Sequence, residues 1–206
     1  MIFGVVITNN RAEVVKPVSF ENAKPFLEGD EIGSYYIAPV KSYLNYDPTL
    51  LHRARTKEIF EVPEKLLIQR ITGGSRPLKV AYDNKQYYNK ESINNLILKE
   101  GSGYNIKFIL TLLNSKLINW FYTHAFTNES KLTVNLSKTY LARIPIKNCN
   151  DFFQQTFVSL ANNMLEQKEY NKNANTINLE KQIDDLVYKL YNLTPEEIQI
   201  IENSVK

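Results

Sequence analysis

The segment from Asp151 to Thr194 restricts the fold most, because it contains neither glycine nor proline. Apolar side chains recur in it at the three- and four-residue spacing of a helix, first at Phe153, Phe157, Leu160, Ala161, Met164 and Leu165, then at Ile183, Leu186, Val187 and Leu190. This period predicts two amphipathic helices. The Asn-rich stretch 171–178 between them is long enough for an antiparallel pair. The sequence Thr-Pro-Glu-Glu at 194–197 then predicts a capped short helix to about Asn203.

The part of the chain before this segment holds all seven glycines and has the pattern of short strands. Residues 2–8 predict a buried strand, and the apolar stretches 66–71 and 78–82 predict a hairpin around the loop TGGSRP. The stretch LLNSKLINWFY, residues 112–122, is either a stacking surface or a core helix. Its large side chains continue the helical spacing that starts at Ile109, so we predict a core helix at about Asn105 to His124.

These patterns together predict an α+β fold. We expect a mixed, β-rich domain at 1–148, with the helix at 105–124 as its central packing helix. A C-terminal helical region follows at 149–206, with two antiparallel helices and the short last helix.

Composition predicts an ordinary globular protein that needs no disulfide bond or metal ion for its stability. The chain has 206 residues, of which 43% are hydrophobic and 23% charged, which is typical of a chain that buries its own core. Cys149 is the single cysteine, and the two histidines, His52 and His124, lie far apart in the sequence. No apolar run approaches the roughly 18 residues of a membrane span, and the N-terminal stretch lacks a signal-peptide pattern. We therefore expect a cytoplasmic chain with no internal disulfide, metal, cofactor or membrane partner.

Motifs for catalysis are weak or missing in the sequence. Asp151 and the triplet Glu-Gln-Lys at 166–168 have the residue types of a metal-dependent nuclease, but they fall in a helical pattern that would separate the carboxylates by about four turns. The glycines at 73–74 and 101–103 lack the spacing of a phosphate loop. The tetrapeptide YDPT at 46–49 is not the motif that grips a flipped base, and neither histidine supports a Ser-His-Asp set. We expect no catalytic residue and interpret the chain as a binding protein.

Charge is unevenly divided along the chain. Residues 52–149 hold 16 Lys and Arg against 7 Asp and Glu, a net charge of 16 − 7 = +9. Residues 150–206 hold 5 against 9, a net charge of −4, and the first 51 residues carry −2. A basic middle indicates a polyanionic partner, and the alternative is that its lysines only solvate a surface.

Six stretches carry a family resemblance when they are taken in order. They are FLEGDEIGSYYI at 26–37, FEVPEKLLIQRIT at 60–72, YDNKQYY at 82–88, IKFILTLLNSKLINWFY at 106–122, YLARIPI at 140–146 and IDDLVYKLYNLTPEEIQIIE at 183–202. From about residue 25 to its end, the chain resembles the TaqI-like C-terminal specificity domain of bacterial type II restriction-modification methyltransferases. The upstream methylase motifs of such proteins are absent from this sequence.

The resemblance implies a target recognition domain that binds double-stranded DNA. Such a domain positions a target adenine for a methyltransferase domain, in cis or in trans, which uses S-adenosylmethionine and is accompanied in some members by a nuclease. No base-contacting residue carries over from the family, because reading residues vary with the target.

The candidate DNA-binding residues come instead from residue chemistry. They are Arg53, Arg55, Arg70, Gly73, Gly74, Arg76, Lys79, Lys85, Lys131 and Lys138. In the loop TGGSRP the two glycines let the backbone approach DNA, and Arg76 at the tip can present its guanidinium to O6 and N7 of guanine. Arg70 either contacts DNA or pairs with a carboxylate inside the domain. The segment HRARTK, residues 52–57, either clamps phosphates or forms a solvated turn.

Two other functions remain open at this point. The chain could be a half-sized specificity subunit, similar to those of type I systems, that forms a homodimer through its C-terminal helices. Alternatively, it could be a protein-binding scaffold with no role in nucleic-acid binding. Salt separates the last function from the others, because binding through several phosphate contacts weakens steeply as salt rises.

Overall fold

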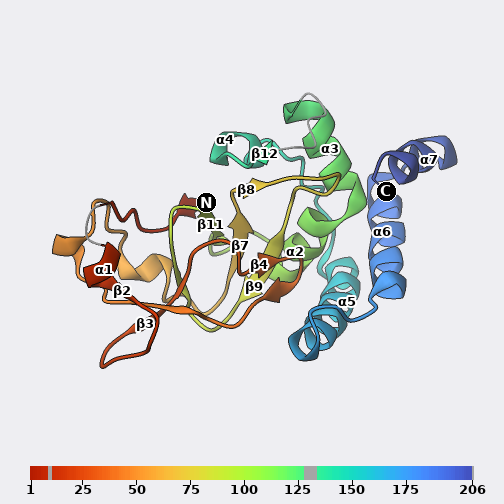
Figure 1. The fold of residues 1–206 in the computed structure, drawn as a ribbon. Coiled ribbons are helices and arrows are strands. Elements are labelled where there is room, and N and C mark those ends of the chain that lie inside the picture. The colour runs from red at the N-terminus through yellow and green to blue at the C-terminus, as the bar shows by residue number, and fades with distance from the viewer. Residues whose placement is uncertain (9–10, 128–133, 206) are drawn as a thin grey trace.

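The main sheet has four antiparallel strands and lies in the middle of the molecule (Figure 1). The computed structural model describes residues 1–8, 11–127 and 134–205. Across the sheet, the strands are β1 (Ile2–Phe3), β11 (Ile93–Leu96), β7 (Lys65–Gln69) and β9 (Val80–Asp83). In the pair β7 and β9, Leu66 lies opposite Tyr82 and Ile68 opposite Val80, so the predicted hairpin is confirmed.

A second sheet of short strands forms the end of the molecule opposite the long helices (Figure 1). Its strands, in spatial order, are β10 (Tyr88–Asn89), β3 (Lys24–Leu27), β6 (Ser42–Leu44) and β2 (Val15–Lys16). The short pairs are β4 (Ile32–Gly33) with β5 (Tyr36–Ile37), and β8 (Ile71–Thr72) with β12 (Val134–Asn135). Single helical turns are α1 (Arg11–Val14), α4 (Lys138–Leu141) and the 3-10 helices Pro48–Leu50 and Lys57–Ile59. This end has its own hydrophobic cluster, in which Phe60 stacks on Tyr88 at 4.4 Å between ring centroids.

The strand predicted for residues 2–8 is shorter than expected, because the chain changes sheets at Gly4. β1 holds two residues, and the residues after Gly4 form single bridges to Lys90 and Arg53. A Cβ atom at Gly4 would overlap the carbonyl oxygen of Asn89. Only glycine allows the two backbones to pass so closely, and the first residues thereby connect both sheets.

The predicted core helix is broken into two, α2 (Ile106–Asn114) and α3 (Lys116–Phe126). The break is at Ser115, whose backbone is extended and whose hydroxyl accepts a hydrogen bond from the N–H of Ile118, as in an N-cap. The predicted outer ends, about Asn105 and His124, agree with the structure to within two residues, but the prediction of one continuous helix was wrong, because a helical period does not reveal an internal cap. The break places the Asn114 amide against Val80: Oδ1 accepts from the Val80 N–H at 3.2 Å, and Nδ2 donates to its carbonyl at 2.9 Å.

Three helices complete the fold, α5 (Asp151–Tyr170), α6 (Ile177–Tyr191) and α7 (Pro195–Ser204). The capping box before α7 is present, since the Thr194 hydroxyl accepts from the N–H of Glu197 and the Glu197 carboxylate accepts from the N–H of Thr194. Buried side chains of these helices, including Phe157, Met164 and Val187, share one hydrophobic cluster with α2 and α3. The α+β fold is confirmed. The division at residue 148 stays a prediction, although this cluster crosses it.

The described residues contain neither a membrane-spanning helix nor a metal-binding cluster. Among residues 1–8, 11–127 and 134–205, no helix is both long and apolar enough to cross a membrane. In the same ranges, no group of three or more His, Cys, Asp and Glu side chains is arranged to hold a metal ion.

Candidate nucleic-acid interface

Two arginines stack on one phenylalanine at the start of the main sheet. The guanidinium carbon of Arg55 lies 4.1 Å from the centroid of the Phe3 ring, and that of Arg70 lies 5.6 Å from it. Arg70 follows β7 directly, and its Nη1 donates to the carbonyl of Glu91 at 2.7 Å. A guanidinium over a ring face is attracted by the ring quadrupole. Both arginines are thus held in place, although they come from segments far apart in the sequence.

The segment around Arg55 is held by the second sheet. The Tyr46 hydroxyl donates to the Arg55 carbonyl, and the buried Nε of Arg55 has no hydrogen-bond partner among the described residues. Arg53 exchanges two backbone hydrogen bonds with Val6, and its side chain is exposed. Lys57 is also exposed, with its ammonium 5.8 Å from the centroid of the Tyr46 ring. The segment is therefore anchored by its backbone and presents basic side chains.

Lys138 extends this basic region toward β12. It is exposed and begins α4, which Ser137 caps. The pKa of the Met1 amine is lowered by burial first, and then by the positive charges of Lys138 and Lys99. Both lysines therefore lie near the start of β1.

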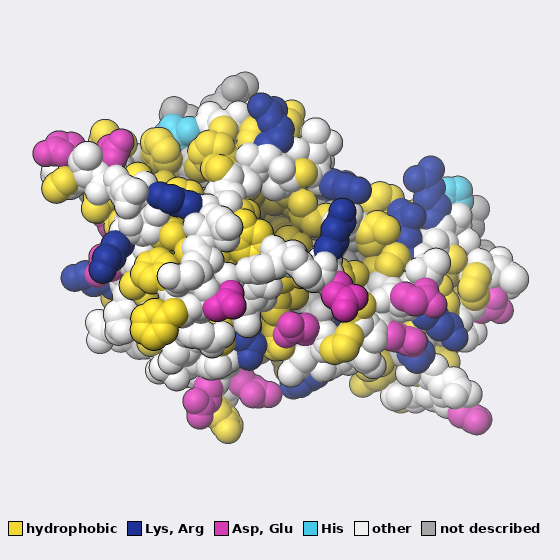
Figure 2. Space-filling view, turned by 180° about the vertical axis from the view of Figure 1, so that it is seen from behind, with side chains coloured by type: hydrophobic (Ala, Val, Ile, Leu, Met, Phe, Trp, Pro, Cys, Tyr) yellow, Lys and Arg dark blue, Asp and Glu magenta, His cyan; other side chains and the backbone are white. Residues whose placement is uncertain are grey.

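We call Phe3, Arg53, Arg55, Arg70 and Lys138 the arginine face. No ion pair between described residues involves any of its four basic side chains. On the side of the molecule seen in Figure 2, Lys and Arg side chains lie beside a hollow lined with hydrophobic side chains, and most Asp and Glu side chains lie below it. Charges without a carboxylate partner leave a positive potential that attracts anions.

Arg76 lies in the hairpin loop, away from the arginine face, and its guanidinium is bonded within the protein. Its Nη1 donates to Oε2 of Glu180 on α6 at 2.9 Å, and its Nη2 donates to the Asn114 carbonyl at 2.6 Å. Because α6 lies beside the loop, the carboxylate of its Glu180 pairs with Arg76. Gly74 is exposed, and its φ of +84° favours glycine, although nothing lies within 4 Å of a Cβ built on it; the close approach of DNA to this loop stays a prediction.

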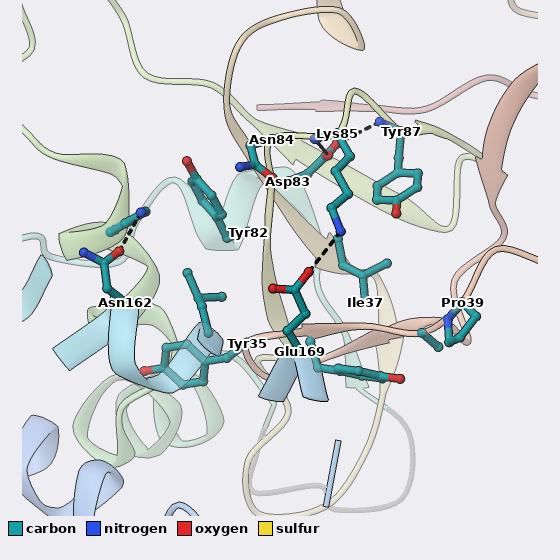
Figure 3. Close-up of a pocket in the computed structure, with 14 residues that line it drawn as sticks. Tyr35, Ile37, Pro39, Tyr82, Asp83, Asn84, Lys85, Tyr87, Asn162 and Glu169 are labelled. Carbon is teal, nitrogen blue, oxygen red and sulfur yellow. Dashed lines mark hydrogen bonds and ion pairs between the residues drawn. The ribbon is translucent and has the colours of Figure 1, made fainter. Parts of the chain in front are cut away.

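Lys85 also faces the C-terminal helices and not the arginine face. Its ammonium lies 3.3 Å from the Glu169 carboxylate, across the pocket shown in Figure 3. This pocket has a volume of ≈ 490 Å³ and lies between β5, β9 and α5; tyrosines such as Tyr35 and Tyr82 line it. Lys107 is also occupied, with its ammonium 2.6 Å from Asn162 Oδ1. The lysines here are matched by carboxylates and amides, so the pocket carries little free charge.

The three remaining candidate residues lie outside the arginine face or outside the described residues. Lys79 lines a hollow beside Arg76, Gly73 precedes Gly74 in the open loop, and Lys131 lies outside the described residues. Sequence reasoning missed Phe3, which it assigned to a buried strand, and Arg143, which stacks on Phe126 at 5.2 Å. A cation over a ring is a tertiary contact, so no local pattern could have revealed either. DNA contact by each candidate stays a prediction.

Comparison with known families decides the relationship. Residues 24–146 match the model of the TaqI-like C-terminal specificity domain. This chain belongs to that family. The matched range of the specificity domain includes the four basic residues of the arginine face, but not Phe3 or α5 to α7.

Two relatives of the specificity domain are much longer than this chain. This chain is 29% identical over 181 residues to the "Putative type II restriction enzyme and methyltransferase" of Methanocaldococcus jannaschii. The alignment covers 84% of this chain and 15% of that protein. The solved structure of the type IIL restriction-modification enzyme MmeI in complex with DNA superposes with a TM-score of 0.65 and 12% identity, over 99% of this chain and 35% of that one. The second likeness shows the fold alone. The specificity domain therefore spans about 15% and 35% of the lengths of these two proteins.

Proposed function

We propose that this specificity domain reads a short sequence in double-stranded DNA. It would thereby select the adenine that a methyltransferase domain outside this chain, in cis or in trans, modifies. S-adenosylmethionine would bind to that catalytic domain, and we assign no residue of this chain to it. Both relatives are restriction-modification proteins by name, and MmeI was solved with DNA.

The arginine face is the observation that carries this proposal. Two guanidinium groups are fixed on one ring, and neither is neutralised by an ion pair within the described residues. Arg side chains fixed before binding lose less conformational entropy when they bind. The buried Nε of Arg55 has no partner among the described residues, and such a donor is costly unless an acceptor approaches it. A phosphate backbone supplies such anions along its whole length.

The roles on this face divide by how firmly each side chain is held. Arg70 uses one N–H for the Glu91 carbonyl and keeps its other donors, so it is our candidate to read guanine through O6 and N7. Arg53 and Lys138 are exposed, which suits phosphate contacts that position the domain. Arg55 would support Arg70 through the shared ring.

The test is selection of bound duplexes from a random pool, repeated at two salt concentrations. Wild-type protein should enrich one short motif, and binding should weaken as salt rises. Arg70→Gln should lose the base preference at one position of the enriched motif, while Lys189→Gln, an exposed change on α6, should keep the whole motif. Salt-sensitive binding without enrichment would mean that reading requires the catalytic domain. Absence of binding at low salt would refute the proposal and favour the protein-binding scaffold.

A homodimer through the C-terminal helices stays a prediction. Several large apolar side chains on these helices are exposed, with Phe152 and Tyr170 each 86% exposed and Ile177 70% exposed. However, the opposite faces of the helices are already buried against α2 and α3. Sedimentation across a concentration series decides the point, since a single species of monomer mass throughout would contradict the dimer.

A further inference from the structure

A second basic region lies between the hairpin loop and the helices, away from the arginine face. A hollow of ≈ 260 Å³ is lined by the turn between β4 and β5 and by Arg76, Lys79, Lys168 and Glu180. The three basic side chains come from two segments, the loop before β9 and the last turn of α5. We call this site the lysine hollow. Tyr35, labelled in Figure 3, lines both the lysine hollow and the pocket of that figure.

The charges of the lysine hollow do not balance. Three cations and one carboxylate line the hollow, and Glu180 is already bonded to Arg76 at 2.9 Å and to the Thr176 hydroxyl at 2.9 Å. Arg76 also interacts electrostatically with Asp184 and Glu202, so the unbalanced cations are Lys79 and Lys168. Lys79 makes no ion pair or side-chain hydrogen bond within the part of the chain that the structure describes, although its side chain is partly buried. Partly buried like charges repel each other more strongly than exposed ones, because the local dielectric constant is lower. An anion in the hollow would therefore stabilise Lys79.

Lys168 has a structural role that does not use up its ammonium group. Its Nζ donates to the carbonyl of Lys172, just past the end of α5, at 3.5 Å. Lysines often stabilise helix C-termini in this way. An ammonium has three donors, however, and this contact uses one of them. The remaining donors of Lys168 are available to a ligand in the hollow.

We infer that the lysine hollow binds a phosphate group, held by Lys79 and Lys168. Phosphate offers several acceptor oxygens to cationic donors, and Lys acts toward it as a point charge. One water takes about 30 Å³ of liquid volume, so the hollow has room for a phosphate and some of its hydration shell. The exposed Ser34 on the β4–β5 turn adds a hydroxyl at the rim. The phosphate belongs either to a DNA backbone or to a free phosphorylated compound.

The first experiment uses inorganic phosphate as the probe. Binding to the full chain is measured by calorimetry and by the width of the ³¹P resonance, with chloride adjusted to keep the ionic strength constant. The double variant Lys79→Gln, Lys168→Gln should bind phosphate about a hundredfold more weakly than the wild type, since each of the two charged hydrogen bonds is worth about tenfold. Lys189→Gln should bind like the wild type. Circular dichroism checks that each variant is folded.

Glu180→Gln provides a change of opposite sign. It removes the single carboxylate among the lining residues and frees Arg76, so phosphate should bind more tightly than to the wild type. A variant that only loosened the structure would not do this. The inference is overturned if the wild type binds phosphate no better than chloride at equal ionic strength. It is also overturned if the double variant binds phosphate as tightly as the wild type.

A second arm identifies the source of the phosphate. If it is a DNA backbone, the double variant should lower the slope of log K against log salt for a duplex by about two, one for each lysine. If it is a free compound, the duplex slope should stay unchanged while phosphate binding is lost. This inference does not depend on the proposed function. If phosphate bound in the hollow but DNA did not bind at any salt concentration, the inference would hold and the proposed function would be refuted.

Discussion

Asp184 on α6 should make the stability of this protein depend on pH in a direction opposite to most carboxylates. Its side chain is 2% exposed; Oδ1 accepts from the N–H of Lys116 at 2.9 Å, while Oδ2 is buried without a partner among the described residues. Burial raises the pKa of Asp184 from 3.8 to about 6, although the bond to Lys116 and the charge of Arg76 act against this rise. The charged form is therefore disfavoured in the folded state.

The sign and size of the effect follow from linkage. Since the folded pKa is above the unfolded one, the stability contributed by the neutral carboxyl is present below pH 3.8 and is lost as pH rises through about 6. The whole difference corresponds to about 3 kcal/mol, of which about 2.4 kcal/mol falls between pH 4 and pH 8. Asp184→Asn cannot titrate. Its free energy of unfolding, minus that of the wild type, should rise by about this amount from pH 4 to pH 8.

Urea denaturation of both proteins at several pH values measures this difference. Subtraction removes the other titrating groups, and a constant offset from the new amide does not affect the slope. Asp185→Asn is the matched control, because the neighbouring Asp185 is exposed and its replacement should change little. A difference between Asp184→Asn and the wild type that stays constant from pH 4 to pH 8 would refute the reasoning.

Three further predictions concern DNA reading and the packing of α2. Arg70→Gln should relax the choice of base at one position by about 1 to 3 kcal/mol, measured by competition between duplexes. Arg76→Gln, which breaks the ion pair with Glu180, should leave the choice of base unchanged. If Arg76→Gln relaxed the choice of base and Arg70→Gln did not, the reading residue would be in the loop. Lys138→Gln should weaken binding to all sequences alike and lower the salt slope by about one, whereas a sequence-dependent loss would contradict a phosphate contact. Asn114→Ala should destabilise the fold by about 1 to 3 kcal/mol in urea denaturation, because it leaves the buried N–H of Val80 unpaired, while the Val80 carbonyl keeps its bond from the Tyr35 N–H. An unchanged midpoint would mean that water replaces the amide.

Elements with local signals were predictable from the sequence. The cap, proline and glutamate that begin α7 are neighbours in the chain, and the apolar periods of α5 and α6 lie within single segments. The β7–β9 hairpin was also predictable, because its strands flank one loop. The break at Ser115 was not, since a cap inside a helical period leaves that period almost intact.

The candidate site was only partly predictable, because its contacts are distant in the sequence. Residue type and charge identified Arg55 and Arg70, but nothing near either residue pointed to their common ring, Phe3. Arg76 was correctly assigned to the hairpin loop, but its partner Glu180 lies 104 positions further along the chain and no local pattern indicated it. Such pairs depend on how helices dock on the sheet, which single-segment patterns do not report.

The amide contacts of α2 and α3 with β9 also affect how the protein behaves at high concentration. β9 is the last strand of the main sheet, and its unpaired backbone groups would otherwise accept a strand from another molecule. Asn114 holds both groups of Val80, and Asn119 accepts from the N–H of Leu78 at 2.8 Å. These side chains close the edge as a neighbouring strand would. Loosening of the helix pair from the sheet should therefore be the step that exposes the protein to aggregation.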